Sequence, residues 1–190
     1  MQQNKCLIVA LEIASSQQLL LDEIAEGRTV VANIEIAPII DHPSFRALIN
    51  ELIKMRKHND CLKLIAIDAE LGLKIGRDEW MAEKLTGQVG EAPVMALLGN
   101  LHTLKKVEWN PTITKKEPYV AEILVVQGHN VKSYPQIWMD RACNTRNRLI
   151  SANQPEAVKL LNADLFALLN ASEPQTVTDI IDGIILWECD

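Results

Sequence analysis

The sequence predicts an α/β fold, in which a mainly parallel β-sheet is flanked by helices on both faces. Short apolar runs of strand length alternate along the chain with longer segments whose apolar residues recur every three or four positions. Neighbouring parallel strands need crossover connections of a dozen or more residues, and these are usually helices. With 190 residues, 48% of them hydrophobic, the chain is predicted to form a single domain over residues 1–190.

The first half of the chain contains three predicted strands. They are residues 6–12 (CLIVALE), 62–68 (LKLIAID) and 93–100 (PVMALLGN). Each is a nearly continuous apolar run, as expected for strands that are covered on both faces. The segment 29–40 (TVVANIEIAPII) is assigned instead to an edge strand or a loop, because Pro38 would interrupt a central ladder.

Helices are predicted between these strands from their start and stop signals. Ser15 and Gln18 fit a capping box, so a helix is expected to begin there and to end at Gly27. Pro43 opens a second helix with one buried stripe, and Asp78 is placed to cap a third helix.

The second half of the chain gives weaker patterns. Residues 120–128 (VAEILVVQG) fit either a strand or a helix stopped by Gly128, and the helix is preferred, with a strand at 130–138 behind it. A helix over 155–170 and a last strand at 183–188 complete the predicted elements.

Composition and charge exclude several classes of function. The 19 Lys+Arg and 25 Asp+Glu give a net charge of −6, and the pI near 5.3 argues against nucleic-acid binding. No run approaches the ~20 apolar residues that span a bilayer, and the N-terminus lacks a secretory pattern. A cytoplasmic protein with no membrane partner is therefore expected. P-loop, Rossmann, serine-hydrolase and zincin motifs are absent from the sequence.

The four cysteines are widely separated in the sequence. They are Cys6, Cys61, Cys143 and Cys189, and none belongs to a C-x-x-C pair. This spacing indicates neither a zinc ribbon nor a redox pair. Reduced, partly buried thiols are expected.

Polar side chains follow the ends of the three predicted strands. Glu12 ends the first strand, Asp68 ends the second, and Asn100 and His102 follow the third. Because ligands in open α/β sheets bind beyond the carboxyl ends of parallel strands, these residues are expected to converge. A carboxylate and an imidazole can form an oriented general base or bind a divalent metal, and Arg77 can hold an anionic group or pair with a carboxylate.

Structural roles compete with these functional ones. Asp68 is better explained as the cap of the next helix than as a catalytic group. Glu12 is a poor capping residue and is expected to be buried, so it needs a partner. His102 follows Gly99 at a strand end and is the strongest functional candidate among the histidines.

Three segments resemble a known superfamily. They are VALEIASSQQLLLDEIAEG, GRDEWMAEKL and VMALLGNLHTLKKV. The first is similar to a strand bearing a glutamate with the helix that follows, the second to an R-D-x-x-M-A signature, and the third to a strand with a G-x-x-H motif. In this order, from about Leu7 to Val107, they resemble the superfamily of ChaN-like haem-binding proteins and erythromycin esterases, with Tiki/TraB proteins as distant relatives.

The resemblance implies that Glu12, Arg77, Asp78 and His102 face one cleft at the carboxyl edge of the sheet. Esterase-like members use such groups for acid/base hydrolysis, Tiki-like members bind a metal, and ChaN-like members bind haem as a dimer. The family's earlier G-E-x-H-type motif has no counterpart here, since only MQQNK precedes the Glu12 strand. Either the natural product starts further upstream, or this is a shortened, non-hydrolytic member that keeps the cleft for binding.

Three functional hypotheses follow. In the first, a cleft formed by Glu12, Arg77, Asp78, Asn100 and His102 binds a small-molecule ligand, haem or a divalent metal without turnover. In the second, His102 oriented by Glu12 activates water, and Arg77 stabilises negative charge on an ester or amide. In the third, Arg77 is only a salt-bridge partner of Glu12, and a second copy covers an exposed sheet edge to form a homodimer.

Overall fold

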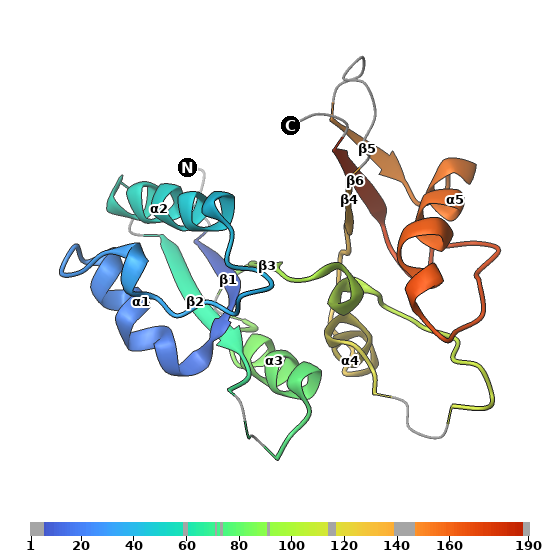
Figure 1. Ribbon diagram of the computed structural model, residues 1–190, viewed down its shortest axis with the longest axis horizontal. Coiled ribbons are helices and arrows are strands. Elements are labelled where there is room, and N and C mark those ends of the chain that lie inside the picture. The colour runs from blue at the N-terminus through green and yellow to red at the C-terminus, as the bar shows by residue number, and fades with distance from the viewer. Residues whose placement is uncertain are drawn as a thin grey trace. The chain divides into compact units, whose positions relative to one another are not determined.

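The protein is described here by a computed structural model covering residues 6–58, 61–70, 72, 74–90, 92–113, 117–138 and 147–187. The chain divides into two compact units, Met1–Leu98 and Gly99–Asp190, each with its own hydrophobic core. Helices and strands occur in both units (Figure 1), so the predicted α/β class is confirmed. A single domain over the whole chain stays a prediction.

The first unit is built on a parallel three-stranded sheet with the order β2-β1-β3. The strands are β1 (Leu7–Ala14), β2 (Leu62–Asp68) and β3 (Val94–Leu97). β1 is central, because Leu7 pairs with Leu62 on one side and Leu11 pairs with Leu97 on the other. All three strands predicted for this half of the chain are confirmed.

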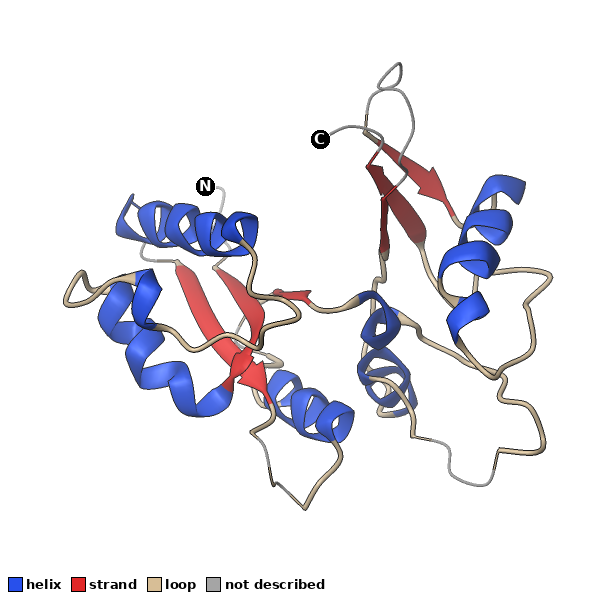
Figure 2. Ribbon diagram, viewed as in Figure 1, coloured by secondary structure: helices blue, strands red, loops and turns tan. Residues whose placement is uncertain are grey.

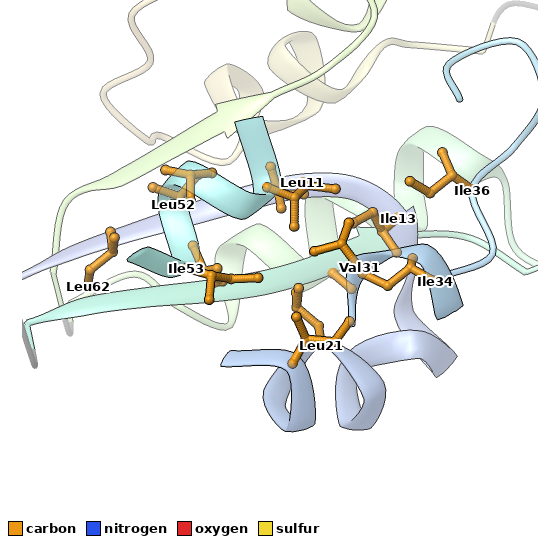
Figure 3. Packing of buried hydrophobic residues seen from close by; sticks show 14 residues of the cluster. Leu11, Ile13, Leu21, Val31, Ile34, Ile36, Leu52, Ile53 and Leu62 are labelled. Atoms are coloured by element: carbon orange, nitrogen blue, oxygen red, sulfur yellow. The ribbon is translucent and has the colours of Figure 1, made fainter. Parts of the chain in front are cut away.

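Helices lie on both faces of this sheet (Figure 2). They are α1 (Gln18–Ala25), α2 (Pro43–His58) and α3 (Arg77–Thr86). Side chains of α1 and α2 pack with alternate residues of β1 and β2, and Figure 3 shows Leu21 of α1 and Leu52 and Ile53 of α2 in this cluster. Met81 of α3 is also fully buried, but it lies outside that cluster. The segment 29–40 forms a loop with a short 3-10 turn at Val31–Asn33, as the loop alternative predicted.

The capping box predicted at the start of α1 is wrong. Ser15 lies in a 3-10 turn, Ser15–Gln17, and its Oγ accepts a hydrogen bond from Trp80 Nε1 at 3.2 Å. The Gln18 amide binds the backbone of β2 instead, because its Oε1 accepts the Ala66 N–H at 2.7 Å and its Nε2 donates to Leu64 O at 3.2 Å. Gln18 therefore satisfies backbone groups that an edge strand would leave unpaired. The helix does end before Gly27, which has a φ of 77°.

Gln18→Leu is expected to lower the free energy of unfolding by about 1–2 kcal/mol, because two backbone groups of β2 lose their partner. Urea unfolding measures the loss, and hydrogen exchange of the Ala66 amide should become faster. Gln17→Leu is the matched control, since the Gln17 side chain accepts the exposed Glu35 N–H at a long 3.4 Å. Unchanged exchange at Ala66 would show that the Gln18 contact does not protect β2.

Asp78 does not cap α3, which corrects a second prediction. The N-cap residue is Gly76, without a side-chain cap hydrogen bond, and Asp78 lies in the first turn of the helix. A carboxylate at that position still interacts favourably with the helix dipole. The pattern therefore located the helix correctly and misplaced its start by two residues.

The second unit contains a mixed sheet with the order β4-β6-β5. Its strands are β4 (Gln136–Trp138), β5 (Arg148–Ser151) and β6 (Gly183–Trp187), and β6 pairs parallel with β4 and antiparallel with β5. The helices are α4 (Val120–Val126) and α5 (Pro155–Asp164), with 3-10 turns at Asn100–Thr103 and Phe166–Leu168. The helix at 120–128 and the last strand are confirmed, the predicted helix over 155–170 ends earlier, at Asp164, and only Gln136–Trp138 of the strand predicted at 130–138 forms a strand, whereas β5 was not predicted. In the described part of the chain, no helix combines the length and apolarity of a membrane span.

The expectation of reduced cysteines is wrong for two of the four. Cys6 and Cys61 form a disulfide between the amino-terminal ends of β1 and β2. They are 55 residues apart in the sequence, but their Cα atoms lie 4.2 Å apart, because each immediately precedes the Leu7–Leu62 pair. Cys143 and Cys189 lie outside the described residues.

Candidate functional site: an acid–arginine cluster in the first unit

Two buried carboxylates lie at the carboxyl ends of β1 and β2. Glu12 and Asp68 are each 7% exposed. The parallel pairing of β1 and β2, which ends with Ala14 opposite Asp68, brings both strand ends to the same edge of the sheet. The predicted burial of Glu12 is confirmed, and so is its need for a partner.

Arg77, the first residue of α3, binds both carboxylates. Its Nη2 lies 2.5 Å from Glu12 Oε1, while Nε and Nη2 lie 2.7 Å and 2.9 Å from the two carboxylate oxygens of Asp68. The contact with Asp68 is thus bidentate, the geometry for which a guanidinium is best suited. We call Glu12, Asp68 and Arg77 the acid–arginine cluster.

The cluster joins two buried anions to one accessible cation. The side chain of Arg77 is 44% exposed, compared with 8% for Glu12 and 10% for Asp68. Hydrogen bonding to Asp68 raises the pKa of Arg77 above its usual value, burial opposes this, and the charge of Glu12 adds to the increase. The guanidinium therefore stays charged, and two carboxylates with one guanidinium leave a net charge of −1.

α3 is held against the end of β1 by contacts near the cluster. Trp80 donates from Nε1 to Ser15 Oγ, just beyond β1, and Lys84 Nζ lies 4.3 Å from the centroid of the Trp80 ring. Met81 and Leu85 of the same helix are buried. These contacts fix the first turn of α3, and Arg77 with it, beside the strand ends.

Asp68 has a different role from the one expected. Its Oδ1 accepts the Ala69 N–H at 2.8 Å as well as the Arg77 Nε, and Gly76 rather than Asp68 is the N-cap of α3. The predicted capping role of Asp68 is therefore wrong, and its carboxylate instead binds Arg77 at the start of α3. The sequence did indicate both carboxylates of the cluster, since Asp68 and Glu12 each lie at or near the end of an apolar strand.

The other predicted site residues are distributed between the two units. Asp78 lies next to Arg77 in α3, partly exposed, and its role in ligand binding stays a prediction. Asn100 and His102 belong to the second unit. Since Glu12 belongs to the first unit, its predicted convergence with His102 also stays a prediction.

Asn100 and His102 have local contacts within the second unit. Asn100 binds the backbone of Gln136 at the start of β4, donating from Nδ2 to its carbonyl at 2.5 Å and accepting its N–H at 2.9 Å. The ring of His102 meets the ring of Tyr119 edge to face, with centroids 6.2 Å apart. Asn100 therefore holds the turn Asn100–Thr103 against β4.

The second unit has a charged centre that sequence analysis missed. Asp182, just before β6, accepts hydrogen bonds from Lys105 Nζ at 2.7 Å, Lys132 Nζ at 2.9 Å and the Ser133 N–H at 2.9 Å. The side chains of Lys105 and Asp182 are only 11% and 17% exposed. Lys105, Asp182 and the adjacent pair Lys132 and Ser133 are far apart in the sequence and have no common motif, so only the fold brings them together.

The side chains of the acid–arginine cluster do not fit a metal centre. Among the described residues, no group of three or more His, Cys, Asp or Glu side chains is placed to hold a metal ion. Both carboxylates of the acid–arginine cluster already bind the guanidinium. Haem iron usually takes a His, Cys, Met or Tyr ligand, and the cluster offers only carboxylate oxygens, while Tyr119 and Tyr134 belong to the second unit.

A scan against protein-family models, a search of curated proteins and a search of solved structures each found no match. The similarity of the three segments to the ChaN-like and erythromycin-esterase superfamily therefore stays a proposal.

Proposed function

We propose that the protein binds a small-molecule ligand without turnover at the carboxyl edge of the first unit's sheet. The observation that supports this most is the acid–arginine cluster, in which side chains from β1, β2 and α3 meet at that edge. Buried carboxylates are costly unless they are paired. Their presence at the edge where α/β sheets bind ligands is the feature that a binding site would explain.

The strand order supports the same edge. In the order β2-β1-β3, the chain passes from β1 to β2 on one side of β1 and then crosses over to form β3 on the other side. The order of the strands thus reverses beside β1, and ligands in open α/β sheets bind at such a reversal. Glu12, close to the carboxyl end of β1, is next to this position.

The charge of the cluster restricts the class of ligand. With a net charge of −1 and a partly exposed guanidinium, the edge favours a neutral or cationic ligand that has hydrogen-bonding groups. A polyanion is disfavoured, because the two carboxylates already neutralise Arg77. For the same reason Arg77 is poorly suited to stabilise an oxyanion, which weakens the hydrolase alternative.

Ligand-observed NMR with a library of neutral and cationic fragments (amines, amides and polyols) tests the proposal, with hemin followed separately by absorbance. At least one fragment is expected to bind saturably and to raise the melting temperature. Glu12→Gln is expected to weaken its binding about tenfold, since a charged hydrogen-bond acceptor is lost.

Glu51→Gln is the matched control, because the side chain of Glu51 in α2 is 64% exposed and pairs with Lys54 of the same helix. The proposal predicts wild-type affinity for this variant. A library without a saturable binder, or equal affinities of the wild type and Glu12→Gln for every binder, would contradict it.

A purely structural cluster is the second candidate, and the direct contacts of Arg77 with both carboxylates favour it. It predicts that Glu12→Gln lowers the free energy of unfolding and leaves the binding of every fragment unchanged. Measuring affinity and stability on the same variant therefore distinguishes the two candidates.

A further inference from the structure

The disulfide between Cys6 and Cys61 joins the first unit's sheet at the end opposite the acid–arginine cluster. Cys6 precedes β1 and Cys61 precedes β2, and the Leu7 N–H donates to Cys61 O at 2.8 Å. The covalent bond and this hydrogen bond therefore connect the same two chain segments. They fix the register of β1 against β2 at the point where the pairing begins.

The position of the disulfide leaves it open to reagents in solution. Cys6 is exposed and Cys61 is half-buried, whereas the strands that follow them are almost completely buried. Exchange with a thiol requires that an attacking thiolate reach one of the sulfurs. A sulfur at an exposed strand start meets this requirement, in contrast to a disulfide inside the core.

We propose that Cys6 and Cys61 form a redox modification site that exchanges with small-molecule thiols, and that its oxidation state sets the stability of the first unit. The thiolate of a small thiol attacks one sulfur, forms a mixed disulfide and releases the other cysteine as a thiolate, which takes a proton from water. A second small-molecule thiolate then attacks the small-thiol sulfur of this mixed disulfide, which forms the small-molecule disulfide and releases the remaining cysteine as a thiolate that is protonated in turn. In total, one protein disulfide and two small thiols give two cysteine thiols and one small-molecule disulfide.

The effect on stability follows from the length of chain that the disulfide closes. The two cysteines are 55 residues apart, and the loop between them contains α1 and α2. A cross-link over a loop of this length strongly restricts the unfolded chain. Reduction is therefore expected to lower the melting temperature of the first unit by roughly 10–20 °C.

Peptide mapping of the full chain tests the pairing directly. After alkylation without reductant and digestion with trypsin, peptides 6–28 and 58–63 are expected as one disulfide-linked species, which dithiothreitol separates. In buffers of reduced and oxidised glutathione, the linked fraction should follow a single two-electron transition. Free Cys6 and Cys61 under oxidised glutathione, or linked peptides that resist dithiothreitol in the folded protein, would overturn the proposal.

Melting curves test the consequence for stability. The wild type should lose stability in dithiothreitol, whereas Cys6→Ser/Cys61→Ser should melt at the temperature of the reduced wild type and show no response. Cys143→Ser/Cys189→Ser is the matched control and should respond as the wild type does. If the double variant does not fold, reduced and oxidised wild type still provide the comparison, and equal melting temperatures would refute the stabilising role.

Discussion

Arg77→Met is expected to lower the free energy of unfolding by about 3 kcal/mol at pH 7, the largest loss among the changes considered. The substitution keeps much of the side-chain volume and removes the positive charge that Glu12 and Asp68 share. Both carboxylates would then be buried without their cation. This expected loss is at the low end of the range for breaking a buried ion pair. The reason is that the Arg77 side chain is 44% exposed, so solvent screens part of its interaction with the carboxylates.

Arg148→Met is the matched control. Arg148 also binds a carboxylate with two nitrogens, Nη1 at 3.0 Å and Nη2 at 2.7 Å from Glu156, but both side chains are about half exposed (46% and 45%). Its loss should cost less than about 1 kcal/mol. Urea unfolding at pH 7 measures both variants. Equal costs for the two variants would contradict a special role for the cluster.

Asp182→Asn is expected to destabilise the second unit by about 2 kcal/mol at pH 7. Burial raises the pKa of Asp182, but hydrogen bonds from Lys105, Lys132 and the Ser133 N–H outweigh it and lower the pKa from 3.8 to about 2. Because the pKa is lower in the folded state, the charged carboxylate stabilises the fold at pH values above about 4. This contribution is lost as the pH falls from about 4 to about 2.

The difference in stability between wild type and Asp182→Asn should therefore be constant near neutral pH and disappear in acid. Chemical unfolding of both proteins between pH 7 and pH 2 measures it. Asp179→Asn is the control, because Asp179 is 53% exposed and its ion pair with Lys106 lies at the surface, so its loss should cost less than about 0.5 kcal/mol. A difference that persists unchanged at pH 2 would show that the charge of Asp182 is not its cause.

Much of the fold was predictable because buried parallel strands leave a strong mark on the sequence. The apolar runs that became β1, β2 and β3 are nearly continuous, and Pro43 and Gly27 marked helix ends through backbone geometry. β5 was missed because its four residues include an arginine and give no pattern. The predicted cap at Ser15 failed because Trp80, distant in the sequence, binds its hydroxyl.

The candidate site was predictable only in part. Strand ends identified Glu12 and Asp68, and the hypothesis of a Glu12–Arg77 salt bridge matches the observed contact. The bidentate contact of Arg77 with Asp68 depends on where α3 begins relative to β2, which no local pattern specifies. The Cys6–Cys61 pairing likewise depends on the register of β1 and β2, and spacing along the chain holds no information about it.

A double-mutant cycle on Glu12 and Arg77 tests most directly whether the acid–arginine cluster acts as one unit. Glu12→Gln, Arg77→Met and the double variant are compared with the wild type by urea unfolding at pH 7. If the two side chains stabilise each other, the double variant should lose at least about 1 kcal/mol less than the sum of the single losses. Additive losses would show that Glu12 and Arg77 are energetically independent, and the proposed site would lose its basis.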